Sequence, residues 1–489
     1  MKKLGLLIFV FISSLSLFAQ KNDNKYEIKV KINGVHDTVI YLGYHFGAKQ
    51  FVIDTARIDQ KGYAVFKGNT DLNRGIYLIA MPSKNMNYFE ILLGNDGRSF
   101  SVETDTSNYV EHMKIKGSQE NIVFNEYQRK MSEFQKTRMD LNKEYNDAKD
   151  NAAEQENIRI KMEKSNNERE NYMNSLIKTY PDFFFSKILL SLLDIKIPEP
   201  PKDEEGNVID PNFQYFYYKD HYFDNIDFSE NGLLRTPIYE GKLDYYLTRM
   251  VVPAPDSLIK ETHDIINRAY EGGDSLVFQY TLSRLFNTYD TSKVMGYDAV
   301  FVAIAEDWYL SGKATWADST LLAKISERVD KITPNKIGNV APNLTKMQSL
   351  DDKYYSLHQI PGDYTVMIFW EPSCGHCKKE VPKLMDELRD TLHKLNVSVF
   401  AVYTQYDKEE WKKFIEEKKL NENGWYNVWD GPYPHSKFRD LYDIYSTPVV
   451  FVLDKDKKII GKRMGVENIK SLIDFQKKKE EFEKEIQQN

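Results

Sequence analysis

The order of apolar and polar residues divides the chain into three stretches, and the first has the period of β-strands. Residues 26–32 alternate polar and apolar side chains, which is the period of a half-buried strand. Asn33-Gly34 follows this segment and is typical of a hairpin turn. Turn residues separate further strand candidates at residues 38–42, 63–66 and 76–80. The pattern predicts a small all-β, sandwich-like domain over residues 26–117.

The middle stretch, residues 118–333, has the period of α-helices. Apolar side chains recur at steps of three and four residues between Phe124 and Ala148, and a charged segment follows at 147–171. A long helical hairpin fits this pattern best, with a coiled-coil dimer as the alternative. Residues 213–228 are dense in Tyr and Phe, which favours packing between helices over a binding platform. The region is therefore expected to be mainly α-helical, with further helices at residues 257–270, 276–289 and 299–309.

In the last stretch, residues 338–480, strands and helices alternate. Apolar runs predict strands at residues 364–370, 397–403, 449–453 and 458–463. Helical patterns lie between and after them at residues 374–395, 408–419 and 467–484. This order predicts an α/β domain, an open sheet with helices on both faces.

The first twenty residues predict export. Lys2 and Lys3 precede an uncharged apolar run from Leu4 to Phe18, and Ala19 offers a small residue for cleavage. Residues 1–20 therefore resemble a secretory signal peptide, with an uncleaved N-terminal anchor as the alternative. No cysteine follows the run, so a cysteine-linked lipid anchor is excluded, and no later segment is apolar for long enough to span a bilayer.

Charge and cysteine content narrow the function. The formal net charge of −7 argues against a nucleic-acid partner, which would favour a basic surface. The chain has only two cysteines, Cys374 and Cys377. A bridge between them closes almost no loop, so it would stabilise the fold very little. The pair is therefore expected to serve chemistry.

The pair lies where a predicted strand runs into a predicted helix. Free N–H groups and the partial positive charge of a helix N-terminus stabilise a thiolate, and the thiolate is the nucleophile. Cys374 is thus expected to attack a disulfide, while Cys377, one turn further into the helix, is more buried and resolves the mixed disulfide. His376 is expected to stabilise the thiolate and make the disulfide a stronger oxidant, unless it is exposed and without effect. The redox-active Cys374–Cys377 disulfide then requires no other cofactor.

Metal and peroxide chemistry fit the pair less well. A zinc site needs two further ligands, and no second cysteine pair exists. A copper site would need a nearby His or Met, for which His435 is the candidate, and a peroxide-reducing cysteine would not require Cys377. We therefore expect no metal, because Cys-x-x-Cys between a strand and a helix favours dithiol exchange.

Around the cysteines a family resemblance emerges, from about residue 338 to 478. This part of the chain resembles the TlpA/ResA-type branch of the thioredoxin superfamily. The matching motifs are Gly338-Asn339-Val340-Ala341-Pro342, Phe369-Trp370-Glu371-Pro372-Ser373-Cys374-Gly375-His376-Cys377, Pro382 and Ser446-Thr447-Pro448. The resemblance implies a thioredoxin-like fold for residues 338–480. The β-domain and helices before it are similar to extensions found in Bacteroidetes envelope proteins.

The resemblance also assigns site residues. It implies that Trp370, Pro372 and Gly375 form the active-site turn and contact substrate together with Thr447 and Pro448. It further implies a cis peptide bond between Thr447 and Pro448, facing the cysteines.

A glutamate assists proton transfer in the same branch, and here its position is held by Glu380. Thioredoxin places a buried aspartate on the preceding strand, and that position is Ile368 in this chain. Glu380 is therefore the expected proton-transfer residue, with a solvated helix residue as the alternative.

The resemblance implies a protein-disulfide oxidoreductase of the periplasm or cell envelope. Its partners would be envelope protein thiols and disulfides and an upstream membrane electron donor or acceptor. The Gly-His insert is typical of protein disulfide isomerases, so isomerase and reductase of the cytochrome c maturation type both stay open. The alternative from another class is an envelope binding or scaffold protein whose thioredoxin-like domain is accessory.

Overall fold

The computed structural model describes residues 25–81, 87–431 and 435–488, and the predicted signal peptide lies outside them. The chain forms two compact units, Met1–Asp244 and Tyr245–Asn489, which we describe separately. Within the described ranges, no helix combines the length and apolar character needed to cross a membrane.

The first unit begins with two four-stranded sheets, ordered β4-β1-β7-β8 and β3-β2-β5-β6. The strands are β1 (Tyr26–Asn33), β2 (Val39–Phe46), β3 (Lys49–Arg57), β4 (Tyr63–Gly68), β5 (Gly75–Met81), β6 (Asn87–Leu93), β7 (Ser99–Asp105) and β8 (Lys114–Lys116). The alternation in β1 buries Ile28, Val30 and Ile32 in one core with Leu42 and Ile79 of the other sheet. The predicted all-β, sandwich-like domain is confirmed.

The predicted hairpin at Asn33-Gly34 is wrong. Gly34 does turn the chain, with a φ of 87° that favours glycine. However, β1 pairs with β4 and β7, and β2 belongs to the other sheet. Residues 34–38 lead from one sheet to the other, and Val35 among them is buried in the core between the sheets.

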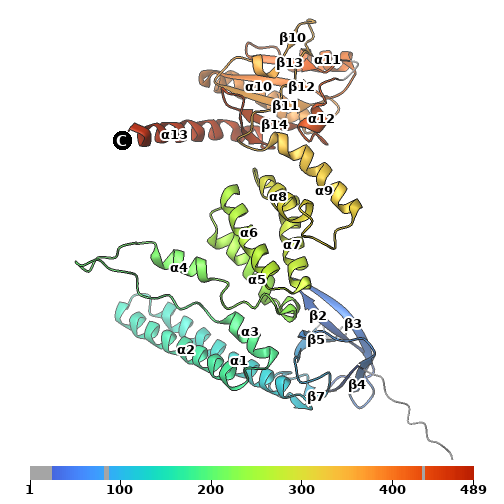
Figure 1. Cartoon of the computed structure of the whole chain (residues 1–489), viewed down its shortest axis with the longest axis vertical. Helices are drawn as coiled ribbons and strands as arrows, with labels where there is room; N and C mark the ends of the chain where they lie inside the picture. The colour runs from blue at the N-terminus through green and yellow to red at the C-terminus, as the bar shows by residue number, and fades with distance from the viewer. Residues whose placement is uncertain (1–24, 82–86, 432–434, 489) are drawn as a thin grey trace, which may run out of the picture. The chain divides into compact units, whose positions relative to one another are not determined.

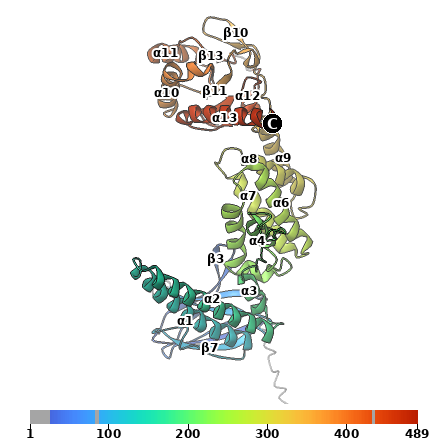
Figure 2. The same cartoon turned by 90° about the vertical axis from the view of Figure 1, so that its left-hand side faces the viewer.

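The predicted helical hairpin is confirmed. Helices α1 (Gln119–Asp147) and α2 (Ala152–Thr179) lie side by side (Figure 1, Figure 2). Ser118 caps α1 by accepting the N–H of Asn121 at 3.1 Å. The buried side chain of Asn121 also bonds both backbone groups of Leu92 in β6, at 2.7 and 2.6 Å. One amide thus joins the helix to the sheet.

Shorter helices complete the first unit: α3 (Phe184–Leu192), α4 (Phe213–His221) and α5 (Ile238–Tyr245), the last of which ends at the unit boundary. Interhelical packing was expected for residues 213–228, and it holds for only part of them. Tyr222, Phe223 and Phe228 are buried, whereas no residue of α4 itself is fully buried.

The second unit begins with helices α6 (Pro255–Glu271), α7 (Ser275–Asp290), α8 (Asp298–Ile304) and α9 (Ser319–Ile332). The three helices predicted in this region are confirmed, and α8 continues as a π-helix over Ala305–Leu310. The rings of Phe278 in α7 and Trp308 in this π-helix pack against each other, with centroids 5.9 Å apart. Helix α9, which we did not predict, leads into the C-terminal domain through the 3₁₀ turn Thr333–Asn335.

The C-terminal domain has a seven-stranded mixed sheet, ordered β10-β9-β13-β12-β11-β14-β15. The strands are β9 (Met347–Gln348), β10 (Tyr354–Tyr355), β11 (Tyr364–Trp370), β12 (Val397–Tyr403), β13 (Trp425–Trp429), β14 (Val449–Leu453) and β15 (Ile459–Lys462). The central strand β11 runs parallel to β12 and antiparallel to β14. Every residue of β11 is buried, as expected of a strand covered on both faces.

Helices cover both faces of this sheet. On one face, Val366 and Ile368 pack with α10 (Cys377–Asp390), α11 (Lys408–Lys418) and α13 (Ile469–Gln488). On the other face, Met367 and Phe369 pack with α12 (Phe438–Leu441) and with the segment that precedes β9. The predicted thioredoxin-like α/β architecture is confirmed, and the short strands β9, β10 and β13 are additions to it.

Candidate active site

The two cysteines lie at the start of α10, but the helix begins later than predicted. Its first residue is Cys377, so Cys374 belongs to the turn between β11 and α10. The backbone N–H of Cys377 donates to Sγ of Cys374 at 3.3 Å. Cys374 therefore faces the free amides of the helix N-terminus from just outside it.

Cys374 is partly buried, and its surroundings favour the thiolate. Burial by itself would raise the pKa of this thiol. Hydrogen bonds from Cys377, Thr447 and the backbone of His376 outweigh burial and hold the pKa of Cys374 below its usual value. A lowered pKa increases the thiolate fraction near neutral pH, and the thiolate is the nucleophile.

Cys377 has the opposite environment. It is 0% exposed and lies in the core beside Ile368 and Val381. Burial raises the pKa of its thiol to about 12. Both cysteines are free thiols here, so the pair has one partly exposed thiol with a lowered pKa and one buried thiol with a raised pKa.

The predicted cis bond between Thr447 and Pro448 is confirmed. The carbonyl oxygen of Thr447 accepts a hydrogen bond from Sγ of Cys374 at 3.2 Å. The loop before β14 and the turn before α10 thus meet at the nucleophile, although 73 residues separate them in sequence.

His376 contacts Cys374 through its backbone. Its side chain is exposed, and its imidazole makes no hydrogen bond to any residue that the structure describes. Its main-chain N–H lies at the Cys374 thiol and helps to lower the pKa of that thiol. The predicted effect of the imidazole charge stays a prediction.

Glu380 is not brought to the cysteines by any contact. It lies partly exposed in the first turn of α10, and within the described ranges no hydrogen bond joins it to Cys374 or Cys377. Its carboxylate instead interacts electrostatically with Lys383, one turn further along the helix. Ile368 is fully buried in the core with Cys377, so the adjacent strand position supplies no carboxylate.

The other predicted contact residues differ in exposure. Trp370 is 0% exposed and packs against Phe414, with ring centroids 5.1 Å apart, so its side chain supports the turn from below. Pro372 is buried as well, whereas Gly375 lies exposed at the tip of the turn. Of these three residues, Gly375 offers the accessible surface beside Cys374.

Two polar residues near the turn were not anticipated. The carboxylate of Glu371 accepts a hydrogen bond from Nε2 of Gln405, which follows β12. Arg439 of α12 donates to the carbonyl oxygen of Thr404 at 2.7 Å. The acidic character of Glu371 within the active-site turn could have drawn attention to it. No spacing in the sequence links Arg439 to the loop after β12.

His435, the residue considered for a copper site, is engaged elsewhere. Its Nδ1 lies 2.9 Å from the carboxylate of Asp430, and its Nε2 lies 3.0 Å from the carbonyl oxygen of Thr345. In the described part of the chain, no three His, Cys, Asp or Glu side chains are grouped so that they could hold a metal ion.

Comparison with known proteins separates the same regions. Residues 337–462 match the AhpC/TSA family, and residues 26–124 and 151–335 match two domains of unknown function, DUF4369 and DUF5106. The thiol-disulfide oxidoreductase ResA of one Bacillus cereus strain is 25% identical over 148 residues, which cover 29% of this chain and 78% of that protein. ResA of Bacillus thuringiensis subsp. konkukian is 26% identical over 146 residues, with the same coverage of both chains.

Two solved structures are also similar to the chain. One is a domain of a possible thiol-disulfide isomerase from Cytophaga hutchinsonii, 39% identical over 31% of this chain and 97% of that chain, with a TM-score of 0.27. The other is a thioredoxin-like protein from Bacteroides caccae, 18% identical over 58% of this chain and 99% of that chain, with a TM-score of 0.44.

Fold, motif and family match agree on the class of the C-terminal domain, which is thioredoxin-like. Over this domain the chain is similar to the thiol-disulfide oxidoreductases named ResA. The protein is thus a protein-disulfide oxidoreductase with a β-sandwich and a helical region before its thioredoxin-like domain.

Proposed function

We propose that the protein is exported and exchanges disulfides with proteins of the periplasm or cell envelope through Cys374 and Cys377. The observation that carries this proposal is the asymmetry of the two thiols. Cys374 is accessible and its pKa is lowered, while Cys377 is fully buried and its pKa is raised to about 12. Dithiol exchange needs this division between an attacking and a resolving thiol.

In the reducing direction, the thiolate of Cys374 attacks one sulfur of a substrate disulfide. A bond forms between Cys374 and the substrate, and the other substrate sulfur leaves as a thiolate that takes up a proton. Cys377 then loses its proton and attacks Sγ of Cys374. The second substrate sulfur leaves, the Cys374–Cys377 disulfide forms, and two electrons have passed to the substrate.

The surface for the substrate is the loop that carries Thr447 and Pro448. Its contact with Cys374 places it beside the sulfur that must react, and exposed Gly375 leaves room on the other side. We assign proton transfer at Cys377 to Glu380, because the neighbouring strand position is occupied by Ile368.

Direction of electron flow depends on the stability of the reduced pair. A lowered pKa of Cys374 stabilises the reduced form and makes the disulfide more oxidising. This favours oxidation or isomerisation over reduction. A membrane protein that donates or accepts electrons would restore the working state of the pair after each cycle.

The proposal is tested by trapping substrates on Cys374. In a Cys377→Ser variant the mixed disulfide cannot be resolved, so envelope proteins should accumulate as adducts that are released by dithiothreitol. The Cys374→Ser, Cys377→Ser double variant is the control and should trap nothing. The proposal fails if the single variant, exported and folded, yields no more adducts than the double variant under mildly oxidising conditions.

A further inference from the structure

The loop before Pro448 determines what faces the nucleophile. Residues 441–447, here called the 441–447 loop, connect α12 to the cis bond. The carbonyl oxygen of Thr447 lies 3.2 Å from Sγ of Cys374 at the end of this loop. A shift of the loop would therefore change the space in which a substrate disulfide meets the thiolate.

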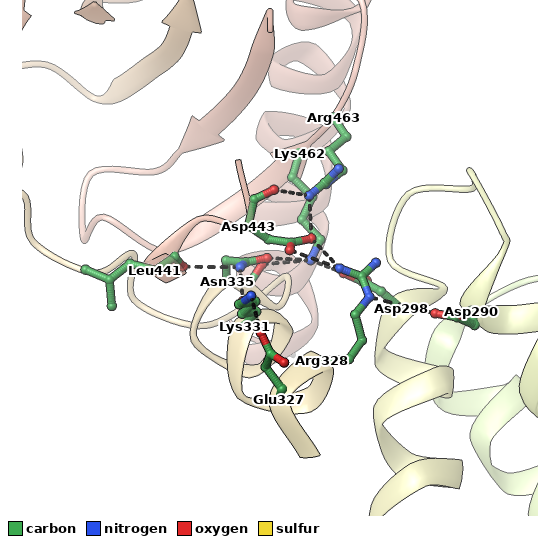
Figure 3. A network of polar contacts seen from close by, with 10 residues as sticks. All are labelled: Asp290, Asp298, Glu327, Arg328, Lys331, Asn335, Leu441, Asp443, Lys462 and Arg463. Carbon is green, nitrogen blue, oxygen red and sulfur yellow. Dashed lines mark hydrogen bonds and ion pairs between the residues drawn. The ribbon is translucent and has the colours of Figure 1, made fainter. Parts of the chain in front are cut away.

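Helix α9, which precedes the thioredoxin-like domain, holds this loop through three residues on one side of the helix and its 3₁₀ extension. Nη1 of Arg328 lies 2.9 and 2.8 Å from the two carboxylate oxygens of Asp443 (Figure 3). Nδ2 of Asn335 donates to the carbonyl oxygen of Leu441 at 3.2 Å. The ammonium of Lys331 lies 5.6 Å from the ring centre of Tyr445. The contacts thus reach the loop at three points, Leu441, Asp443 and Tyr445.

Asp443 is the centre of the arrangement. Its side chain is only 4% exposed, and its backbone has a φ of 54°, a conformation that costs free energy for a residue other than glycine. A second guanidinium, that of Arg463, binds the same carboxylate at 2.6 Å and the Asp443 carbonyl oxygen at 2.7 Å. Arg328 also lies 3.8 Å from Asp290 of α7. The bend at Asp443 is thus held from two sides, by α9 and by Arg463, the residue that follows β15.

A buried lysine connects the same helices to the sheet. Lys462 of β15 has a side chain only 2% exposed, and its Nζ pairs with the carboxylate of Asp298 in α8. The same nitrogen donates to the carbonyl oxygen of Asn335 at 2.8 Å (Figure 3). Removing one partner from a buried charged pair leaves the other uncompensated, so these contacts favour a single arrangement of α9 and the sheet.

We propose that Arg328, Lys331 and Asn335 are positioning residues for disulfide exchange, which hold the 441–447 loop where a peptide strand can lie against it. The helical region then sets how well the site accepts a peptide compared with a small disulfide. This inference rests on the proposed function, because it requires that Cys374 attacks substrate disulfides beside Thr447.

Single-turnover kinetics with the reduced full chain test the inference. Two substrates are compared: a short peptide in mixed disulfide with glutathione, and dithiobis(nitrobenzoic acid), which needs no strand contact. In Arg328→Ala we expect the ratio of the peptide rate constant to the small-disulfide rate constant to fall about fivefold. Arg328→Lys should restore part of the ratio. Lys324→Ala, which removes an exposed charge from the same helix, should leave it unchanged.

The ratio separates positioning from loss of fold. Partial unfolding lowers both rate constants together, so an unchanged ratio in folded Arg328→Ala overturns the inference. Should that variant fail to fold, Lys331→Ala removes the contact with Tyr445 and makes the same test, with a wild-type ratio again overturning the inference. Failure of the wild-type chain to reduce either disulfide would instead overturn the proposed function, and this inference with it.

Discussion

At the scale of single residues, the two thiols differ because one lies outside a helix and the other inside it. The sequence predicted that Cys377 is the more buried thiol, because it lies three residues further along, and the family resemblance predicted the cis bond at Thr447. The contribution of His376 could not be predicted in the same way. Its ring is exposed, and the group that reaches Cys374 is its backbone N–H, which every residue except proline carries.

A pair of substitutions separates the backbone of His376 from its ring. His376 has a φ of −72°, which proline can adopt, so His376→Pro removes the N–H without forcing the chain. The thiolate loses a donor, and we expect the pH midpoint of Cys374 alkylation to rise by about one unit and the reduction potential to become more negative by about 30 mV. Alkylation between pH 5 and 9 and equilibration with glutathione measure the two shifts.

His376→Ala is the matched control, because it keeps the N–H and removes only the imidazole. Its midpoint should stay closer to the wild-type value than that of His376→Pro. If the alanine variant shifts as far as the proline variant, the ring sets the acidity of Cys374 and the backbone contact is unimportant.

At the scale of secondary-structure elements, strands were predictable where apolar residues either alternate with polar ones or form a continuous run. β1 alternates buried and exposed positions and was found, whereas β3 has a single buried residue, Ala56, and offers no alternation. Strand pairing was beyond reach, since Asn33-Gly34 turns the chain equally well toward another sheet. The bond between α1 and β6 had no sequence signal either, because asparagine side chains are mostly exposed.

This bond makes Asn121 a sensitive position of α1. Asn121→Ala leaves the N–H and C=O of Leu92 without their side-chain partners in a buried site, which costs about 1–3 kcal/mol for each unsatisfied group. We expect faster amide hydrogen exchange in β6, measured by mass spectrometry on the full chain. Asn167→Ala, at an exposed position of α2, should leave β6 exchange unchanged, and equal exchange in both variants would contradict the assignment.

At the scale of the whole molecule, the helical region and the thioredoxin-like domain of the second unit share charged contacts that no local pattern encodes. Arg328 and Asp443 are 115 residues apart, and each alone is indistinguishable in sequence from an ordinary surface charge. Resemblance to a family covers one domain at a time and therefore stops at such a boundary. The unit of function was consequently predicted as residues 338–480, while the contacts argue for a larger unit.

Truncation tests whether the second unit is one folding entity. A fragment of residues 336–489 lacks Asp298, Arg328 and Asn335, so Lys462 and Asp443 lose their partners. We expect its Tm to lie roughly 5 °C below that of a fragment of residues 245–489, measured by calorimetry. Asp298→Asn in the longer fragment should give an intermediate Tm. Equal Tm values for the two wild-type fragments would show that the helices do not stabilise the domain.

The burial of Cys377 affects how long the mixed disulfide with the substrate persists. Burial raises the pKa of Cys377 well above neutral pH, so few Cys377 side chains are deprotonated and able to attack in the second step. The covalent complex between protein and substrate then has a dwell time, set by how often that buried proton departs. A long dwell lets another thiol of the substrate resolve the complex first and exchange one pairing for another, while a short dwell completes reduction. The rate at which Cys377 attacks the mixed disulfide would then decide whether a substrate is rearranged or reduced.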